Sequence, residues 1–167
     1  MSVRRWGVSF LSAFFILSGC GSGFSPPYGS GRGPGLEGGL FVAHDIGISR
    51  YTVCRTGKLG HFTFHGTGRA AYMQNSSEDG NLIERPQGGR CLWSGKARMT
   101  SSDHPENSIV FALSLKDGYQ YFPCRTGAKF DIIGGTGEFR HARGSGTIFF
   151  DCDGSVYTDA WSGTVTF

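Results

Sequence analysis

Hydrophobic and polar residues alternate along most of the chain after residue 40. In the clearest segment, the odd positions from Cys91 to Met99 are small or apolar, and the even positions from Leu92 to Thr100 are mostly polar. A period of two is typical of strands that bury one face, because successive side chains point to opposite sides of a sheet. No segment of the chain shows a convincing helical stripe. The pattern therefore predicts an all-β domain.

Further strands are predicted where alternation or β-rich composition returns. They are residues 109–115, with Ile109, Phe111, Leu113 and Leu115 on one face, and then Tyr119–Phe122, Lys129–Ile133, Gly146–Cys152 and Ser155–Phe167. Turn-rich segments separate them, at Thr100–Asn107, Lys116-Asp117-Gly118 and Asp153-Gly154. Glu78-Asp79-Gly80-Asn81 is also interpreted as an exposed turn. Short strands at such spacing favour a sandwich or a closed barrel.

The first 20 residues follow another pattern. Arg4 and Arg5 precede an apolar run from Gly7 to Leu17, which ends in Ser18-Gly19-Cys20 and is typical of a signal peptide. Leu17–Cys20 resembles the lipobox of bacterial lipoproteins, which implies cleavage before Cys20, acylation of that cysteine and a membrane anchor. Because Gly21 is not aspartate, the resemblance implies the outer membrane. An ordinary secretory signal cut near Cys20 is the alternative.

These features predict three parts: a signal peptide at 1–19, a tether rich in Gly, Ser and Pro at 20–39, and one β-barrel or sandwich domain at 40–167. Of 167 residues, 28 are glycine and six are proline, without the Gly-X-Y period of collagen. Sixteen basic and 13 acidic residues give a net charge of +3, and loss of Arg4 and Arg5 with the signal peptide leaves 14 basic residues. Because basic and acidic residues are almost equal in number, nucleic acid is not expected as a partner.

Four cysteines follow Cys20, namely Cys54, Cys91, Cys124 and Cys152. An even number in an exported protein predicts two disulfides, with three connectivities open. A weak repeat, Tyr51-x-x-Cys54-Arg55-Thr56-Gly57 and Tyr121-x-x-Cys124-Arg125-Thr126-Gly127, favours Cys54–Cys91 and Cys124–Cys152, since each half would carry its own bridge. Chance similarity of strand ends explains the repeat equally well. The alternative to the disulfides is a free cysteine with an activated thiol.

Two stretches resemble the allene oxide cyclase and dirigent-like superfamily. They are Phe64–Met73 and the glycine motif Ile132–Gly146, with its Gly-Gly-Thr-Gly-x-Phe core, and Trp161–Val165 resembles the closing strand of bacterial members. The resemblance implies a closed antiparallel barrel of eight strands, with an interior that is either filled or holds one small ligand. It transfers no reaction, because the functional residues of the family do not align with positions of this chain.

The last predicted strand carries the candidate ligand site. If Tyr157 and Trp161 point inward, then Asp159 between them does too, which predicts a carboxyl group inside the barrel with Arg125 or Arg55 as its partner. The alternative is that Val156, Thr158 and Ala160 form the inner face and Asp159 faces water.

Histidines and glycines give weaker signals. His61 and His65 share one strand face but lie roughly 13 Å apart at 3.3 Å per residue, too far to share a metal ion, so no metal or cofactor is predicted. Gly135-x-Gly137 lacks the context of a phosphate loop and instead indicates a turn or bulge, with Phe139 plugging one end of the barrel.

Together these patterns predict a lipid-anchored envelope protein whose barrel binds a small apolar ligand or an envelope partner. An isomerase or cyclase acting inside the barrel is the alternative, with no catalytic residue identified, and a homo-oligomer is left open. The ligand site would use Tyr157, Asp159, Trp161 and Arg125.

Overall fold

The computed structural model describes residues 38–52, 54, 58–87, 90–115 and 126–167. Eight strands run in sequence order, with one short 3-10 helix, η1 (Gly137–Phe139). The strands are β1 (Gly39–Thr52), β2 (Gly60–Ala70), β3 (Gln74–Gln87), β4 (Arg90–Ser101), β5 (Ser108–Ser114), β6 (Thr126–Thr136), β7 (Arg143–Asp153) and β8 (Val156–Thr166).

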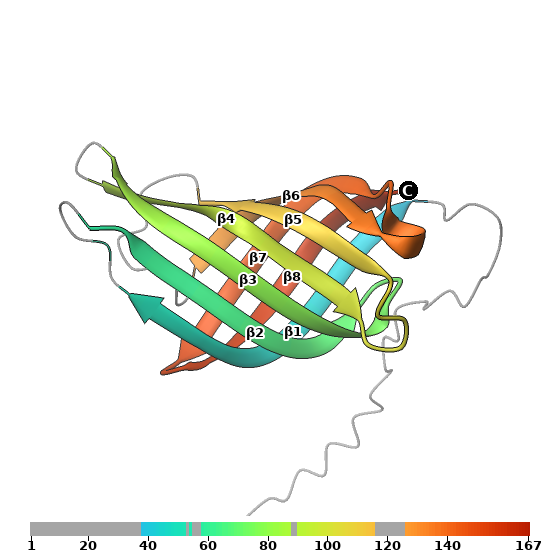
Figure 1. Cartoon of the computed structure of the whole chain (residues 1–167), viewed down its shortest axis with the longest axis horizontal. Helices are drawn as coiled ribbons and strands as arrows, with labels where there is room; N and C mark the ends of the chain where they lie inside the picture. The colour runs from blue at the N-terminus through green and yellow to red at the C-terminus, as the bar shows by residue number, and fades with distance from the viewer. Residues whose placement is uncertain (1–37, 53, 55–57, 88–89, 116–125) are drawn as a thin grey trace, which may run out of the picture.

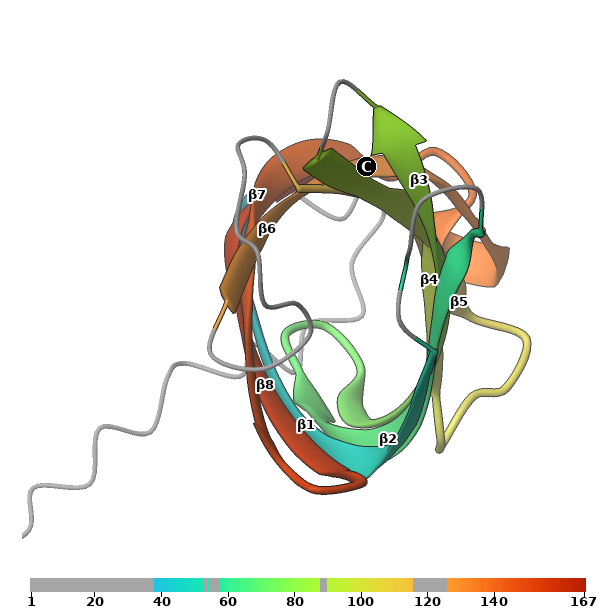
Figure 2. The same ribbon diagram turned by 90° about the vertical axis from the view of Figure 1, so that its left-hand side faces the viewer.

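Each strand pairs antiparallel with the next one, and β8 pairs antiparallel with β1. Figure 1 shows the strands side by side, tilted across the molecule, and Figure 2 shows the ring that they close. The chain is therefore a closed antiparallel barrel of eight strands, as predicted. Closure leaves no exposed sheet edge, which removes a route to aggregation.

The interior is packed with aromatic side chains. Trp161 lies against Phe111 and Phe130, with ring centroids 4.6 and 5.2 Å apart, and Phe64 lies 5.5 Å from Tyr157. The alternation predicted for residues 91–100 is confirmed, because Trp93, Ala97 and Met99 are buried while Ser94, Lys96 and Arg98 are exposed. Burial of this apolar inner face is the main force that holds the barrel closed.

The glycine motif closes one end of the barrel. Ile133 is an extra residue between the pairs Phe111–Ile132 and Val110–Gly134, so a bulge lies just before Gly135–Gly137, where a turn or bulge was predicted. Gly137 has a φ of +57°, a conformation that favours glycine, and it starts η1. Phe139 then turns inward, 2% exposed, and packs on Phe167 with ring centroids 5.6 Å apart.

One local prediction was wrong. Glu78–Asn81 is not an exposed turn but the middle of β3, paired with β2 and β4. The Glu78 side chain points inward and is fully buried, whereas Asp79 and Asn81 are exposed on the outer face. Pairing with two neighbouring strands and burial of the inward position hold this segment extended.

Several predictions fall outside the described residues. They are the signal peptide, Cys20, most of the tether, the hairpin at 116–122, Cys124 and the two arginines Arg55 and Arg125. Within the described ranges, no helix has the length and apolar character needed to cross a membrane.

Candidate functional site

Strand β8 places Tyr157, Asp159 and Trp161 on the inner face of the barrel, all at most 5% exposed. Val156 and Thr158 are exposed on the outer face, so the alternative orientation of this strand is excluded. Of the two orientations that the sequence left open for this strand, the inward orientation of Asp159 is therefore the one observed.

Two further carboxyl groups join Asp159. Oxygen atoms of Asp45, Glu78 and Asp159 lie within 4.8 Å of one another, and the three residues are 4%, 0% and 5% exposed. The backbone N–H of Asp45 donates to Oδ1 of Asp159 at 3.1 Å, and the Ser76 hydroxyl donates to Oδ1 of Asp45 at 3.4 Å. The Tyr157 hydroxyl donates to Oε2 of Glu78, also at 3.4 Å. We call Asp45, Glu78, Tyr157 and Asp159 the carboxyl cluster.

Strand register explains why these side chains meet. Two neighbouring rows of paired residues cross β3, β2, β1 and β8 in that order. The first row consists of Glu78, Gly66, Gly47 and Tyr157. The second consists of Ser76, Gly68, Asp45 and Asp159. Glu78 and Tyr157 are three strand spacings apart, or roughly 14 Å between backbones. A Cβ atom at Gly66 would collide with the Tyr157 hydroxyl, so glycine there leaves the space in which the two side chains bridge the row.

Burial and mutual repulsion raise the pKa values in the cluster. Burial, and next the charge of Asp159, raise the pKa of Asp45 from 3.8 to about 7, although the Ser76 hydroxyl opposes the shift. Burial likewise raises the pKa of Asp159. The pKa of Glu78 is raised well above 4.5, first by burial and then by the charges of Asp159 and Asp45. The phenol of Tyr157 stays protonated, because burial and these carboxylates raise its pKa too.

The hydrogen bonds within the cluster use one oxygen of each carboxyl group. Three oxygens, Asp45 Oδ2, Glu78 Oε1 and Asp159 Oδ2, are buried without a hydrogen-bond partner. Buried polar atoms are normally paired, so three unpaired oxygens at one place call for a functional explanation.

The predicted arginine partners of Asp159 cannot be placed, since Arg125 and Arg55 lie outside the described residues. Sequence reasoning missed Asp45 and Glu78. Asp45 lies at an inward position between the buried residues Ala43 and Ser49, and its alternation with Phe41 and Ala43 was the signal that could have found it. Glu78 stands among Ser, Asp, Gly and Asn, where turn composition concealed the strand.

Two groups among the described residues bring metal-ligating atoms close together. Three carboxylates would suit a hard cation such as Mg²⁺ or Ca²⁺, but protons and a cation compete for the same oxygens and the raised pKa values favour protons. The other acidic group, Glu84 beside Cys54 and Cys91, offers no thiolate because these cysteines are bridged. His61 and His65 are both exposed on the outer wall, and Nδ1 of His65 lies 2.7 Å from Asp79.

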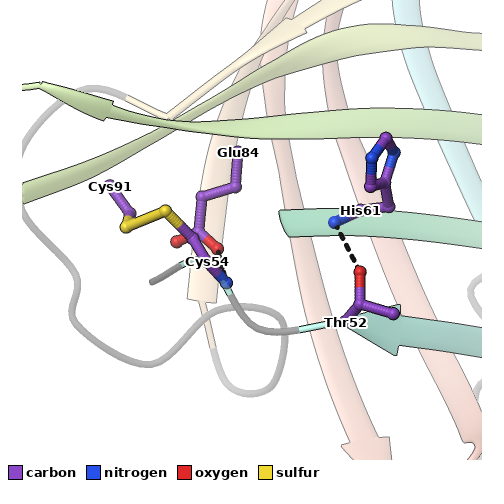
Figure 3. The surroundings of a disulfide bond; sticks show 5 residues. All are labelled: Thr52, Cys54, His61, Glu84 and Cys91. Atoms are coloured by element: carbon purple, nitrogen blue, oxygen red, sulfur yellow. Dashed lines mark hydrogen bonds between the residues drawn. A yellow bond between two sulfur atoms is a disulfide. The ribbon is translucent and has the colours of Figure 1, made fainter. Parts of the chain in front are cut away.

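The disulfide Cys54–Cys91 is present as predicted, with Cα atoms 6.5 Å apart (Figure 3). It ties the segment after β1 to the start of β4. Oε2 of Glu84 accepts a 3.0 Å hydrogen bond from the backbone N–H of Cys54, and burial raises the pKa of Glu84. The second predicted bridge, Cys124–Cys152, stays a prediction because Cys124 lies outside the described residues.

Comparison with models of known protein families gives no match, and comparison with curated protein sequences gives none either. Among solved structures, the chain is similar to the pterocarpan synthase dirigent protein, at 15% identity and a TM-score of 0.48. The match covers 81% of this chain and 89% of that chain. Similarity at this level carries no argument about function.

Proposed function

We propose that the protein is a membrane-anchored bacterial lipoprotein whose envelope-facing barrel binds a small, largely apolar ligand through the carboxyl cluster. The observation that carries the proposal is the set of unpartnered oxygens on Asp45, Glu78 and Asp159, buried beside aromatic rings. Ligand sites combine apolar walls with a few convergent polar groups, and this interior has both. The lipobox-like Leu17–Cys20 supports the anchor.

The polar part of such a ligand would accept hydrogen bonds. Asp45 gains a donor proton below about pH 7, and the raised pKa of Glu78 favours its protonated form, so both carboxyl groups can donate. The apolar part would contact Phe64 and Phe150, whose ring centroids lie 5.5 and 6.2 Å from that of Tyr157.

Native mass spectrometry of the mature protein, extracted from bacterial membranes in mild detergent, tests the proposal. We expect a small molecule that leaves on denaturation, and a peptide from residue 20 with the mass of an acylated cysteine. Asp159→Asn should reduce ligand retention at least tenfold. The control Asp131→Asn removes an exposed carboxylate from the outer wall of β6 and should retain the ligand.

Retention by Asp159→Asn and by Glu78→Gln as in the parent would place the ligand outside the cluster and overturn the proposal. No retained molecule in any preparation would favour a structural envelope protein with a filled interior. An unacylated Cys20 would remove the anchor without affecting the ligand site.

A second candidate function is an isomerase or cyclase that uses the cluster as an acid–base pair. The pKa of Asp45, raised to about 7, favours it because a group that titrates near neutral pH can both give and take a proton. Chromatography of the recovered ligand after incubation with the protein would reveal an isomer. Asp45→Asn should abolish conversion while the ligand is still bound, whereas an unchanged ligand would exclude this candidate.

A further inference from the structure

A second site lies on the outer wall, formed by β1 to β5, which adjoin one another in this order in Figure 1. It is a groove of about 630 Å³, within the range of small-molecule sites. Exposed side chains from four strands line it, namely Arg50, Thr63, His65, Asp79, Asn81, Lys96 and Arg98. Because these side chains point outward, the groove is separate from the carboxyl cluster.

The groove is cationic. Arg50, Thr63, Asn81 and Lys96 form one row across β1 to β4, so the charges of Arg50 and Lys96 start roughly 14 Å apart. Arg98 lies two residues from Lys96 and faces Asp79. Asp79 pairs instead with His65, at 2.7 Å. Across the described ranges, no carboxylate lies within ion-pair distance of Arg50, Lys96 or Arg98.

An aliphatic strip borders these charges. Ile46 and Ile48 alternate with buried residues on β1 and are 56% and 63% exposed, and Val156 of β8, which pairs with Ile48, is 46% exposed. Ile48 also lines the groove, two residues from Arg50. A cationic groove therefore continues directly into exposed apolar surface, which is the complement of an anionic amphiphile.

We infer that this outer groove binds the headgroup of an anionic phospholipid, with the aliphatic strip against its acyl chains. The charge of Arg50, Lys96 and Arg98 matches a phosphate group, and arginine suits phosphate oxygens because its planar fork donates two parallel hydrogen bonds. The inference rests on the proposed function in one respect: the membrane anchor would bring the groove to a bilayer surface, which supplies the lipid. It does not depend on the interior ligand.

Vesicle co-sedimentation tests the inference on the mature chain from residue 20 carrying Cys20→Ala, so that neither acylation nor the signal peptide contributes. The probes are vesicles of phosphatidylcholine, with or without 30% phosphatidylglycerol. We expect binding to the anionic vesicles that weakens with salt. The triple variant Arg50→Gln, Lys96→Gln, Arg98→Gln should bind them on the order of 100-fold more weakly, since each basic residue near an anionic surface contributes comparably.

A matched control removes the same charge elsewhere, by Lys58→Gln, Arg85→Gln and Lys129→Gln at exposed positions outside the groove lining. It should bind as the parent does, within about threefold. Ile48→Ser should weaken binding to vesicles but not to free glycerol phosphate, which would confirm the amphiphilic contact. Equal losses in both triple variants, or no loss in the groove variant, would overturn the inference. Heparin binding provides a further comparison. If the groove variant lost heparin binding but bound vesicles as the parent does, the groove would be assigned to an acidic polysaccharide and the inference would be overturned.

The test separates this inference from the proposed function. If vesicle binding fails, the result for ligand retention by the carboxyl cluster is unaffected. If Cys20 of the mature protein is unacylated, the anchor is contradicted, but vesicle binding by the Cys20→Ala chain still reports on the groove.

Discussion

The backbone N–H of Asp45 donates a 3.1 Å hydrogen bond to Oδ1 of Asp159, across 114 positions of sequence. The two residues are direct partners in the β1–β8 pair that closes the barrel. Closure of the barrel and assembly of the carboxyl cluster are therefore one event. A substitution in the cluster is therefore expected to change the stability of the barrel.

Stability should fall as the pH rises from about 4 to about 7. Burial raises the pKa of Asp45 from 3.8 to about 7, so the native state keeps a proton that the unfolded chain loses. This contribution is complete below pH 4 and is lost as the pH passes 7. Glu78 and Asp159 shift in the same direction and add to it. Urea midpoints should therefore be higher at pH 5 than at pH 8.

Asp45→Asn should flatten that pH dependence, because the amide does not titrate. At pH 8 we expect it to recover part of the difference, on the order of 1–3 kcal/mol. Asp131→Asn, on the outer wall, should leave the slope as it is in the parent. Equal urea midpoints of the parent at pH 5 and pH 8 would contradict the raised pKa of Asp45.

Gly66→Ala should destabilise the barrel by about 1–3 kcal/mol, because the new methyl group collides with the Tyr157 hydroxyl. Tyr157 would then lose its contact with Glu78. The matched control is Gly127→Ala in β6, where a Cβ atom would lie 3.7 Å from the Ile148 carbonyl oxygen, an ordinary contact. Thermal unfolding compares them, and a similar midpoint for both variants would argue against crowding at Gly66.

Removal of the disulfide by Cys54→Ser and Cys91→Ser should cost about 4 kcal/mol, since the bridge closes a loop with a sequence separation of 37 residues. Denaturant unfolding of the double variant against the oxidised parent measures the difference. Reduction of the parent should reproduce the loss. A double variant as stable as the parent would show that β3 and β4 already hold this end of the barrel.

Peptide mapping without reduction should find Cys124 joined to Cys152. Both cysteines remain after Cys54 and Cys91 pair, and an exported protein favours the oxidised form. A free thiol at either position, detected by alkylation after the chain is unfolded without reduction, would contradict this pairing.

Phe139→Ala should destabilise the barrel by about 3–5 kcal/mol, because the ring is 2% exposed and packs on Phe167 at the closed end. Phe149→Ala removes an equal ring that is 49% exposed on β7, and it should cost less than about 1 kcal/mol. Calorimetry of the two variants compares them. Similar losses would mean that Phe139 does not fill the end of the barrel.

The strand pattern and part of the site could be read from the sequence by local rules. Alternation on either side of Asp159 placed Tyr157 and Trp161 on its face, and the aromatic character of those neighbours identified the buried side. The Gly-Gly-Thr-Gly-x-Phe segment predicted a turn or bulge and an inward Phe139, because a tight turn favours glycine at a positive φ and an aromatic ring can fill a barrel end.

Glu78 shows where local rules failed. Ser, Asp, Gly and Asn favour turns in isolation, yet pairing with β2 and β4 holds residues 76–81 extended. Sequence alternation determined that this chain forms half-buried strands and that Asp159 shares a face with Tyr157 and Trp161. Only the tertiary structure decided that Asp45 and Glu78 meet it, because strand register around a closed ring, and not distance along the chain, sets which inward positions share a row.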